Sequence, residues 1–188
     1  TIAFVGKLAT ADSTQVFGQD TRRTVQTSDD GRFLAFASRA DLAGDRSAGD
    51  TQLDVFRYDA VEDDLRRIWS DAPDVNGAAR TGGAVLRTCE CGPTAGARNK
   101  ARPVDLSSMS ADGAVIGFST AVALDPRDQN TTSDGYVWTA GSDAVHLVTS
   151  GRGNESQDTL KFVSRSGNMI GLDSATGLVP EHTSGQTG

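Results

Sequence analysis

Ser28 to Leu42 reads SDDGRFLAFASRADL, and its pattern occurs twice more, at Ser110 to Leu124 (SADGAVIGFSTAVAL) and at Ser164 to Leu178 (SRSGNMIGLDSATGL). The three segments align without a gap over 15 positions. Each begins with a serine, has a glycine three residues later, and ends with a leucine eleven residues after that glycine. A pattern that recurs in register within one chain indicates a protein built from copies of one structural unit.

A second block repeats downstream of the first. Asp54 to Ser70 aligns with Asp134 to Ser150 at a constant offset of 80 residues. Its alternating apolar residues predict strands at Asp54–Tyr58 and at Leu65–Trp69 in the first copy. Each unit then has four strands: one before the Asp-Gly turn, one after it, and these two. Tandem units of four antiparallel strands are the blades of a β-propeller. We therefore predict a β-propeller or a sector of one; a β-sandwich is the alternative.

A turn signal lies near the start of each repeat. Asp30-Gly31 and Asp112-Gly113 predict type I′ hairpin turns, in which both central residues have a positive φ, and Ser166-Gly167 is the third version. The strand after each turn places a large residue and then a small one on the same face. Such a strand is expected to be buried on both sides, with close approach at the small residue. These pairs are Phe33 and Ala35, Val115 and Gly117, and Met169 and Gly171.

Composition agrees with an all-β protein and excludes several functions. The chain has 188 residues, a size that suits one domain, and no segment shows the apolar periodicity of a long helix. Its 18 basic and 25 acidic residues give a net charge of −7, which would repel nucleic acids and anionic membranes. No apolar run is long enough to span a bilayer.

The repeat resembles a known family. S-x-D-G-x-x-x-A-F-x-S from Ser28 to Ser38, followed by D-V-F-x-x-D from Asp54 to Asp59, is similar to the repeat of TolB-like, WD-type propellers. Related repeats occur in the propeller domains of tricorn and prolyl-oligopeptidase-type peptidases. The resemblance covers about two thirds of the chain, and it implies a propeller of the cell envelope. The third copy departs from it, with Ser166 in place of aspartate and Leu172 in place of phenylalanine.

The spacing of the repeats divides the single domain into parts. The first interval is longer than the second, which predicts an insertion at residues 77–102; the alternative is a degenerate extra blade. The two ends are expected to share one blade, so that a strand at Ile2–Val5 lies in the same sheet as the Ser164 unit. The parts are an outer half-blade at 1–20, units at 21–76 and 103–152, the insertion at 77–102, and an inner half-blade at 153–188.

One loop has oxygen ligands at alternate positions. Asp128, Asn130 and Asp134 follow the spacing of the start of a calcium-binding loop, although Thr139 stands where such a loop has its glutamate. Calcium is the only cofactor we consider. The alternative is a solvated acidic loop whose last aspartate caps the following strand.

The insertion contains the main basic cluster of the chain, at Arg98, Lys100 and Arg102. In an otherwise acidic protein this cluster is a candidate binding site for a protein partner; the alternative is an ordinary solvated surface. An insertion of this kind is expected to project from one end of the propeller.

These observations favour a non-catalytic propeller scaffold that binds a protein or ligand in the periplasm, the cell envelope or the extracellular space. Its partners would be another protein, or further chains that complete the propeller. The chain contains neither a G-x-S-x-G nucleophile motif nor a phosphate-binding P-loop. The alternative is the propeller domain of a larger hydrolase, where it would gate or position the substrate.

Overall fold

The structure, a computed structural model, describes residues 4–8, 10–12, 25–44, 52–69, 107–152 and 159–173. Within these residues the protein is all-β, with antiparallel sheets, a short 3-10 helix η1 (Thr10–Asp12) and no α-helix. In this part of the chain no helix is long and apolar enough to cross a membrane. The strands are β1 (Val25–Thr27), β2 (Phe33–Ser38), β3 (Asp54–Asp59), β4 (Asp64–Arg67), β5 (Val115–Thr120), β6 (Asp134–Thr139), β7 (Ala144–Leu147), β8 (Thr159–Val163) and β9 (Ile170–Asp173).

The three sheets follow the repeat. The first has the order β1-β2-β3-β4, so each strand pairs with the one that follows it, as the repeat predicts. The second has the order β5-β6-β7, and Met109 forms an isolated bridge to Ile116 where the first strand of that unit is expected. The third contains β8 and β9. The four-stranded antiparallel unit is therefore complete in the first sheet.

The turn between the first two strands is not the predicted type I′ turn. Gly31 has a φ of 73°, but Asp30 is not among the residues with positive φ, and the same holds for the Asp112-Gly113 pair. Asp30 Oδ1 instead accepts hydrogen bonds from the Arg32 N–H at 3.0 Å and from the Ser28 hydroxyl at 2.6 Å. This Asx-type bonding holds the aspartate in an ordinary conformation and leaves the left-handed one to the glycine.

The serine that opens each repeat also fixes this turn. Its hydroxyl oxygen accepts a hydrogen bond from the backbone N–H five residues later, at the start of the next strand. The bond occurs in all three units, from Phe33 to Ser28 at 2.8 Å, from Val115 to Ser110 at 2.9 Å, and from Met169 to Ser164 at 3.0 Å.

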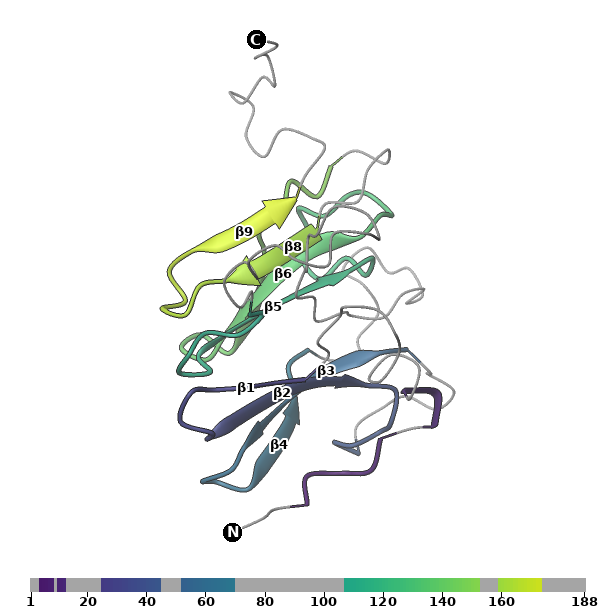
Figure 1. Cartoon of the computed structure of the whole chain (residues 1–188). Coiled ribbons are helices and arrows are strands. Elements are labelled where there is room, and N and C mark those ends of the chain that lie inside the picture. The colour runs from purple at the N-terminus through teal and green to yellow at the C-terminus, as the bar shows by residue number, and fades with distance from the viewer. Residues whose placement is uncertain are drawn as a thin grey trace, which may run out of the picture.

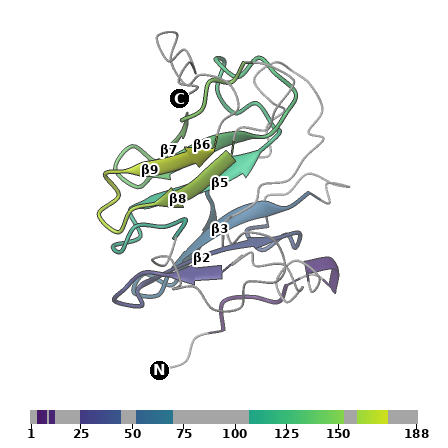
Figure 2. The ribbon, with the colours of Figure 1, turned by 45° about the horizontal axis from the view of Figure 1, so that its top comes forward.

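The three units stack in chain order (Figure 1), and the same order is visible after rotation (Figure 2). In the first two units the small residue of the large–small pair lies where the next sheet approaches. Ala35 is fully buried in the core shared by the first two sheets. A Cβ on Gly117 would lie 2.7 Å from Leu160 Cδ1 and 2.8 Å from Val163 Cγ2. The predicted close approach is therefore confirmed in the first two units.

The third unit differs from this prediction on its outer side. Met169 is 65% exposed, so β9 is not covered there as β2 and β5 are. The place beside Gly171 is taken by Phe162 of its own sheet. A strand can be buried on both sides only if another sheet follows, and among the described residues none follows β9.

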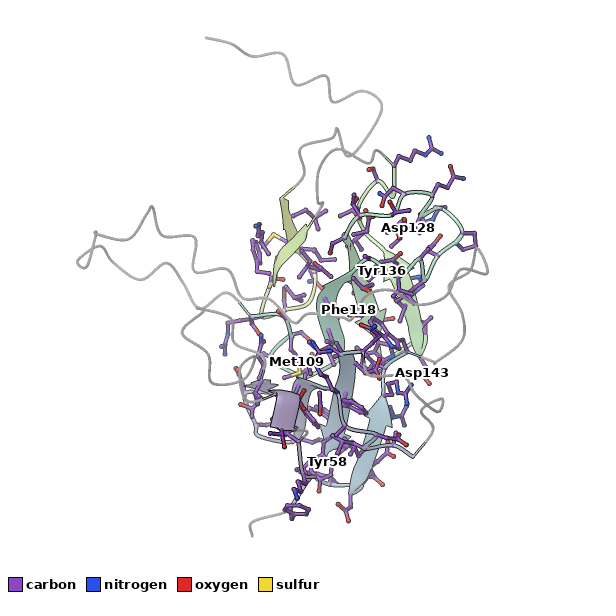
Figure 3. All side chains as sticks on the ribbon, turned by 90° about the vertical axis from the view of Figure 1, so that its right-hand side faces the viewer. Tyr58, Met109, Phe118, Asp128, Tyr136 and Asp143 are labelled. Atoms are coloured by element: carbon purple, nitrogen blue, oxygen red, sulfur yellow. The ribbon has the colours of Figure 1, made fainter. Side chains whose placement is uncertain are left out.

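The main core lies between the first and second sheets. Trp69 meets Phe118 edge-on with 5.0 Å between ring centroids, and Phe118 stacks on Tyr136 at 6.0 Å. Figure 3 shows Phe118 and Met109 at this level of the molecule. Aromatic pairs of this kind contribute about 0.5–1.5 kcal/mol each beyond their area burial. They hold the second sheet, and the loop that precedes β6, in a fixed position.

Residues 4–8 do not contribute to the outer strand that is expected at Ile2–Val5. Phe4 and Val5 are not in a strand, and a Cβ on Gly6 would lie 3.2 Å from Leu42 Cδ2 of the first unit. The shared blade is therefore not observed in residues 4–8, because this segment lies beside the first unit and Phe4 is 85% exposed. Ile2 lies outside the described residues, and the unit boundaries remain predictions.

Candidate functional site

The candidate site begins with two aspartates at equivalent places in the repeat. Asp54 is the first residue of β3, and Asp134, 80 residues later, is the first residue of β6. Both are 0% exposed. Burying a carboxylate costs free energy unless hydrogen bonds or a cation compensate for the lost solvation. The neighbours of each aspartate therefore show how its unit stabilises the buried carboxylate.

In the first unit a cation lies beside the carboxylate. Asp54 Oδ1 accepts a hydrogen bond from Trp69 Nε1 at 2.9 Å. Arg67 Nε lies 3.7 Å from Asp54 Oδ2, and the Arg67 side chain is only 1% exposed. The guanidinium group of Arg67 also lies 3.9 Å from Asp41. The buried negative charge of this unit is therefore balanced within the unit.

The second unit replaces both partners. The residue that corresponds to Trp69 is Thr149, whose hydroxyl donates to Asp134 Oδ1 at 2.6 Å. The residue that corresponds to Arg67 is Leu147, which has no charge. Asp134 Oδ2 is buried and has no hydrogen-bond partner among the described residues. The second unit therefore has the buried carboxylate but no arginine at the position of Arg67.

A second carboxyl group lies near this place. Asp128 is 1% exposed, and its Oδ2 accepts a hydrogen bond from the hydroxyl of Tyr136, which is 0% exposed. Figure 3 shows the two side chains next to each other at one end of the second sheet. The Tyr136 oxygen in turn accepts a hydrogen bond from the Leu124 N–H at 3.1 Å. Tyr136 therefore links β6 to two points of the loop that precedes it, Leu124 and Asp128.

Burial is the main cause of the shifted pKa of Asp128. It raises the pKa of Asp128 to about 6; the hydrogen bond from Tyr136 opposes this shift, and the charges of Asp134 and Asp125 add to it. The pKa of Tyr136 is raised by burial and by its bond to the carboxylate. Nearby Asp125 behaves in the opposite way, because its hydrogen bond from Arg127 lowers its pKa to about 2. The burial of Asp128 thus favours the protonated form of its carboxyl group.

The three predicted calcium ligands differ in how they meet: the backbone N–H of Asn130 donates to Asp128, but the Asn130 side chain bonds within the loop. Asp128 and Asp134 interact electrostatically, whereas Asn130 Oδ1 accepts hydrogen bonds from the N–H of Thr132 at 2.8 Å and from its hydroxyl at 3.0 Å. No cluster of three or more His, Cys, Asp or Glu side chains suited to a metal ion occurs in the described ranges. Calcium at this loop remains a prediction.

The other predicted site lies elsewhere in the chain. Arg98, Lys100 and Arg102 are outside the described residues, so their role as a binding site also remains a prediction. Sequence reasoning missed the contribution of Tyr136 and Thr149. A signal existed, because an aspartate and a hydrogen-bonding side chain recur 15 residues apart in both units, as Asp54 with Trp69 and as Asp134 with Thr149.

Comparison with known proteins gives a distant structural likeness. No family model matches the chain, and no curated protein matches it. It is similar to a TolB protein of Agrobacterium tumefaciens, with 12% identity and a TM-score of 0.36, over 81% of this chain and 43% of that one. A TolB protein of Acinetobacter baumannii shows 16% identity and a TM-score of 0.20, over 79% and 39%.

This chain therefore spans less than half the length of those two proteins. TM-scores this low do not establish a shared fold. The prediction of a β-propeller rests instead on the internal repeat and on the way its units pack.

Proposed function

We propose that the chain is a sector of a β-propeller that acts as a non-catalytic scaffold for binding a protein partner, in the periplasm, the cell envelope or outside the cell. The observation that carries the proposal is the repeated packing of the units, which gives a rigid framework with loops at its ends. The carboxyl groups of the candidate site support it as well. Asp128 and Asp134 are at most 1% exposed, so a substrate cannot reach them and they serve the framework.

In this proposal, the insertion at residues 77–102 binds the protein partner. Loops that leave a rigid scaffold are where binding residues concentrate. Arg98, Lys100 and Arg102 add three positive charges to a chain of net charge −7, so the partner surface that suits them is acidic. Electrostatic complementarity of this kind speeds association and selects the partner.

The test compares two charge-reversal variants of the full chain. In one, Arg98, Lys100 and Arg102 are replaced by glutamate; in the control, glutamate replaces Lys7, Arg66 and Arg152, which are exposed. Both variants have the same net charge, −13 (−7 − 6). The probe is a poly-glutamate peptide, and binding is measured by calorimetry at low and physiological salt.

We expect the first variant to bind at least about tenfold more weakly than the natural chain, while the control stays close to it. Equal losses in both variants would mean that only net charge matters. That result, or a natural chain that does not bind the peptide, would contradict the assignment of the insertion.

A further inference from the structure

The loop that precedes β6 contains an acceptor motif for a sugar. Asn130, Thr131 and Thr132 read N-T-T, which fits the tripeptide Asn-x-Ser/Thr, with x other than proline, that is glycosylated in exported proteins. Tripeptides of this kind recur by chance in a chain rich in serine and threonine. The motif therefore selects a site only where the local structure suits the reaction.

The structure places the third residue of the motif on the side-chain amide of the first. Thr132 donates two hydrogen bonds to Asn130 Oδ1, from its backbone N–H at 2.8 Å and from its hydroxyl group at 3.0 Å. Because the backbone N–H can only donate, it fixes the amide oxygen on this side of the Asn130 side chain. Nδ2, the atom that carries the sugar in a glycosylated asparagine, takes no part in these two bonds.

These two bonds act on the reactivity of the amide. An amide nitrogen is a weak nucleophile because its lone pair is delocalised into the carbonyl group. Two donors on Oδ1 stabilise the negative charge that develops on this oxygen as Nδ2 loses a proton, in the way that an oxyanion hole stabilises an oxyanion. Thr132 thus supplies the group that makes Nδ2 of Asn130 more nucleophilic.

The surroundings of the motif leave room for a glycan. Gln129 and Thr131, on either side of Asn130, are exposed, and Asn130 itself is half-buried. The loop is held by the residues before the motif, since the N–H of Gln129 donates to the carbonyl oxygen of Gly151 at 2.8 Å. Asp128, which is buried, anchors the loop further through Tyr136. None of these anchoring bonds uses the amide group of the Asn130 side chain.

We propose that Asn130 is a site of N-linked glycosylation and that Thr132 activates it. The donor is an oligosaccharide linked to a lipid through pyrophosphate. A bond forms between C1 of the sugar and Nδ2, the bond between C1 and the pyrophosphate oxygen breaks, and the proton of Nδ2 passes to a base of the transferase. The proposal rests on the proposed function in one respect, because it requires a chain that leaves the cytoplasm.

The turn of Asn130 and Thr132 is local, so it can form before the chain folds. Its two bonds join residues two positions apart and need no contact with another strand. The acceptor geometry is therefore available to a transferase that acts during export. The folded loop then keeps the modified side chain at the surface.

The test exports the full chain through a eukaryotic secretory pathway and measures its mass before and after treatment with peptide N-glycosidase. Every variant carries N154Q, because residues 154–156 (N-E-S) are a second motif that lies outside the described residues. We expect the N154Q chain to carry a glycan at Asn130. N130Q and T132A should lose it, T132S should keep it, and T131A is the matched control that should keep it as well.

The effect on the fold is measured on the same samples. Removal of the glycan from the N154Q chain should change its melting temperature by less than about 2 °C, because the modified group is not used in packing. An N154Q chain that is exported without a glycan overturns the proposal. So does a T132A variant that is modified as fully as T131A, and so does a glycan that destabilises the folded chain.

Two comparisons keep this proposal apart from the others. Calcium at this loop would use Oδ1 of residue 130, so N130D should lose the glycan and keep any response to calcium. The peptide-binding test of the insertion uses the chain without a glycan, and the export route in the test is supplied by the host. Failure of glycosylation is therefore distinguishable from failure of the proposed function.

Discussion

At the residue scale, the first two units each have a buried aspartate at the equivalent position, and they stabilise it in different ways. Asp54 has Arg67 beside it, whereas Asp134 has a threonine hydroxyl on one oxygen and a second carboxyl group, Asp128, nearby. The sequence shows both aspartates at the same place in the repeat. It does not show that Tyr136 binds Asp128, because that contact depends on the path of the loop between β5 and β6, and loop paths are set by tertiary packing.

The raised pKa of Asp128 predicts a specific dependence of stability on pH. The folded protein binds this proton more tightly than the unfolded chain, whose aspartates titrate near 3.9. The free energy of unfolding should therefore fall as pH rises from about 4 to about 6, by up to about 3 kcal/mol. D128N should remove this fall, and the measurement is urea unfolding of both proteins across that range.

D125N is the control for this prediction. The pKa of Asp125 is lowered to about 2, so its stabilising effect is present above about pH 4 and is lost at lower pH. The variant should be less stable than the natural chain by a constant amount from pH 4 to pH 7. Parallel curves for D128N and the natural chain over the same range would show that Asp128 is not the group that titrates.

Calcium is tested at the same place. If Asp128, Asn130 and Asp134 bind it, millimolar calcium should raise the melting temperature by mass action, and a chelator should reverse the rise. D134N should melt at the same temperature with and without calcium, and magnesium at equal ionic strength serves as the salt control. If neither calcium nor chelator changes the melting temperature of the natural chain, the loop has no calcium site.

At the element scale, the repeat predicts the strands well because alternation and turn residues are local signals. β2, β3 and β5 lie where the pattern places them, and the large–small pairs of the first two units identify the face that the next sheet covers. The turn type could not be read in the same way. Asp-Gly is compatible with several turns, and the choice was decided by hydrogen bonds from Ser28 and Arg32 to Asp30.

Gly117 provides the test of packing between sheets. G117A should destabilise the protein by about 1–3 kcal/mol, because the new methyl group would overlap Leu160 and Val163. The same substitution at Gly141, where a Cβ meets nothing within 4 Å, should change stability by less than about 0.5 kcal/mol. Neither glycine has a positive φ, so the difference in urea unfolding reports contacts alone. Equal effects at both sites would argue against tight packing of the third sheet on β5.

At the scale of the whole molecule, the order of the units could be predicted from the sequence. The structure of the N-terminal segment and the contacts of the outer faces could not. Copies of one unit stack in chain order because each presents the same two faces (Figure 1). The N-terminal segment has no repeat partner, and alternation at Ile2 and Phe4 alone favoured a strand that is not found at Phe4. What lies against an outer face depends on contacts between distant parts of the chain, or between chains, and no local pattern encodes them.

The turns that open the three units, at Asp29, Ala111 and Arg165, also bear on how such a protein evolves. Each turn recognises the next through a backbone hydrogen bond, from the N–H of Asp29 to the carbonyl oxygen of Ala111 and from the N–H of Ala111 to that of Arg165, and through the missing side chain of a glycine. Neither feature depends on the identity of the surrounding residues, so the rest of each unit can diverge as long as the serine, the glycine and one large residue persist. A duplication of one unit inserts a unit that already fits both of its neighbours, and the number of units can change in one genetic event without any new interface.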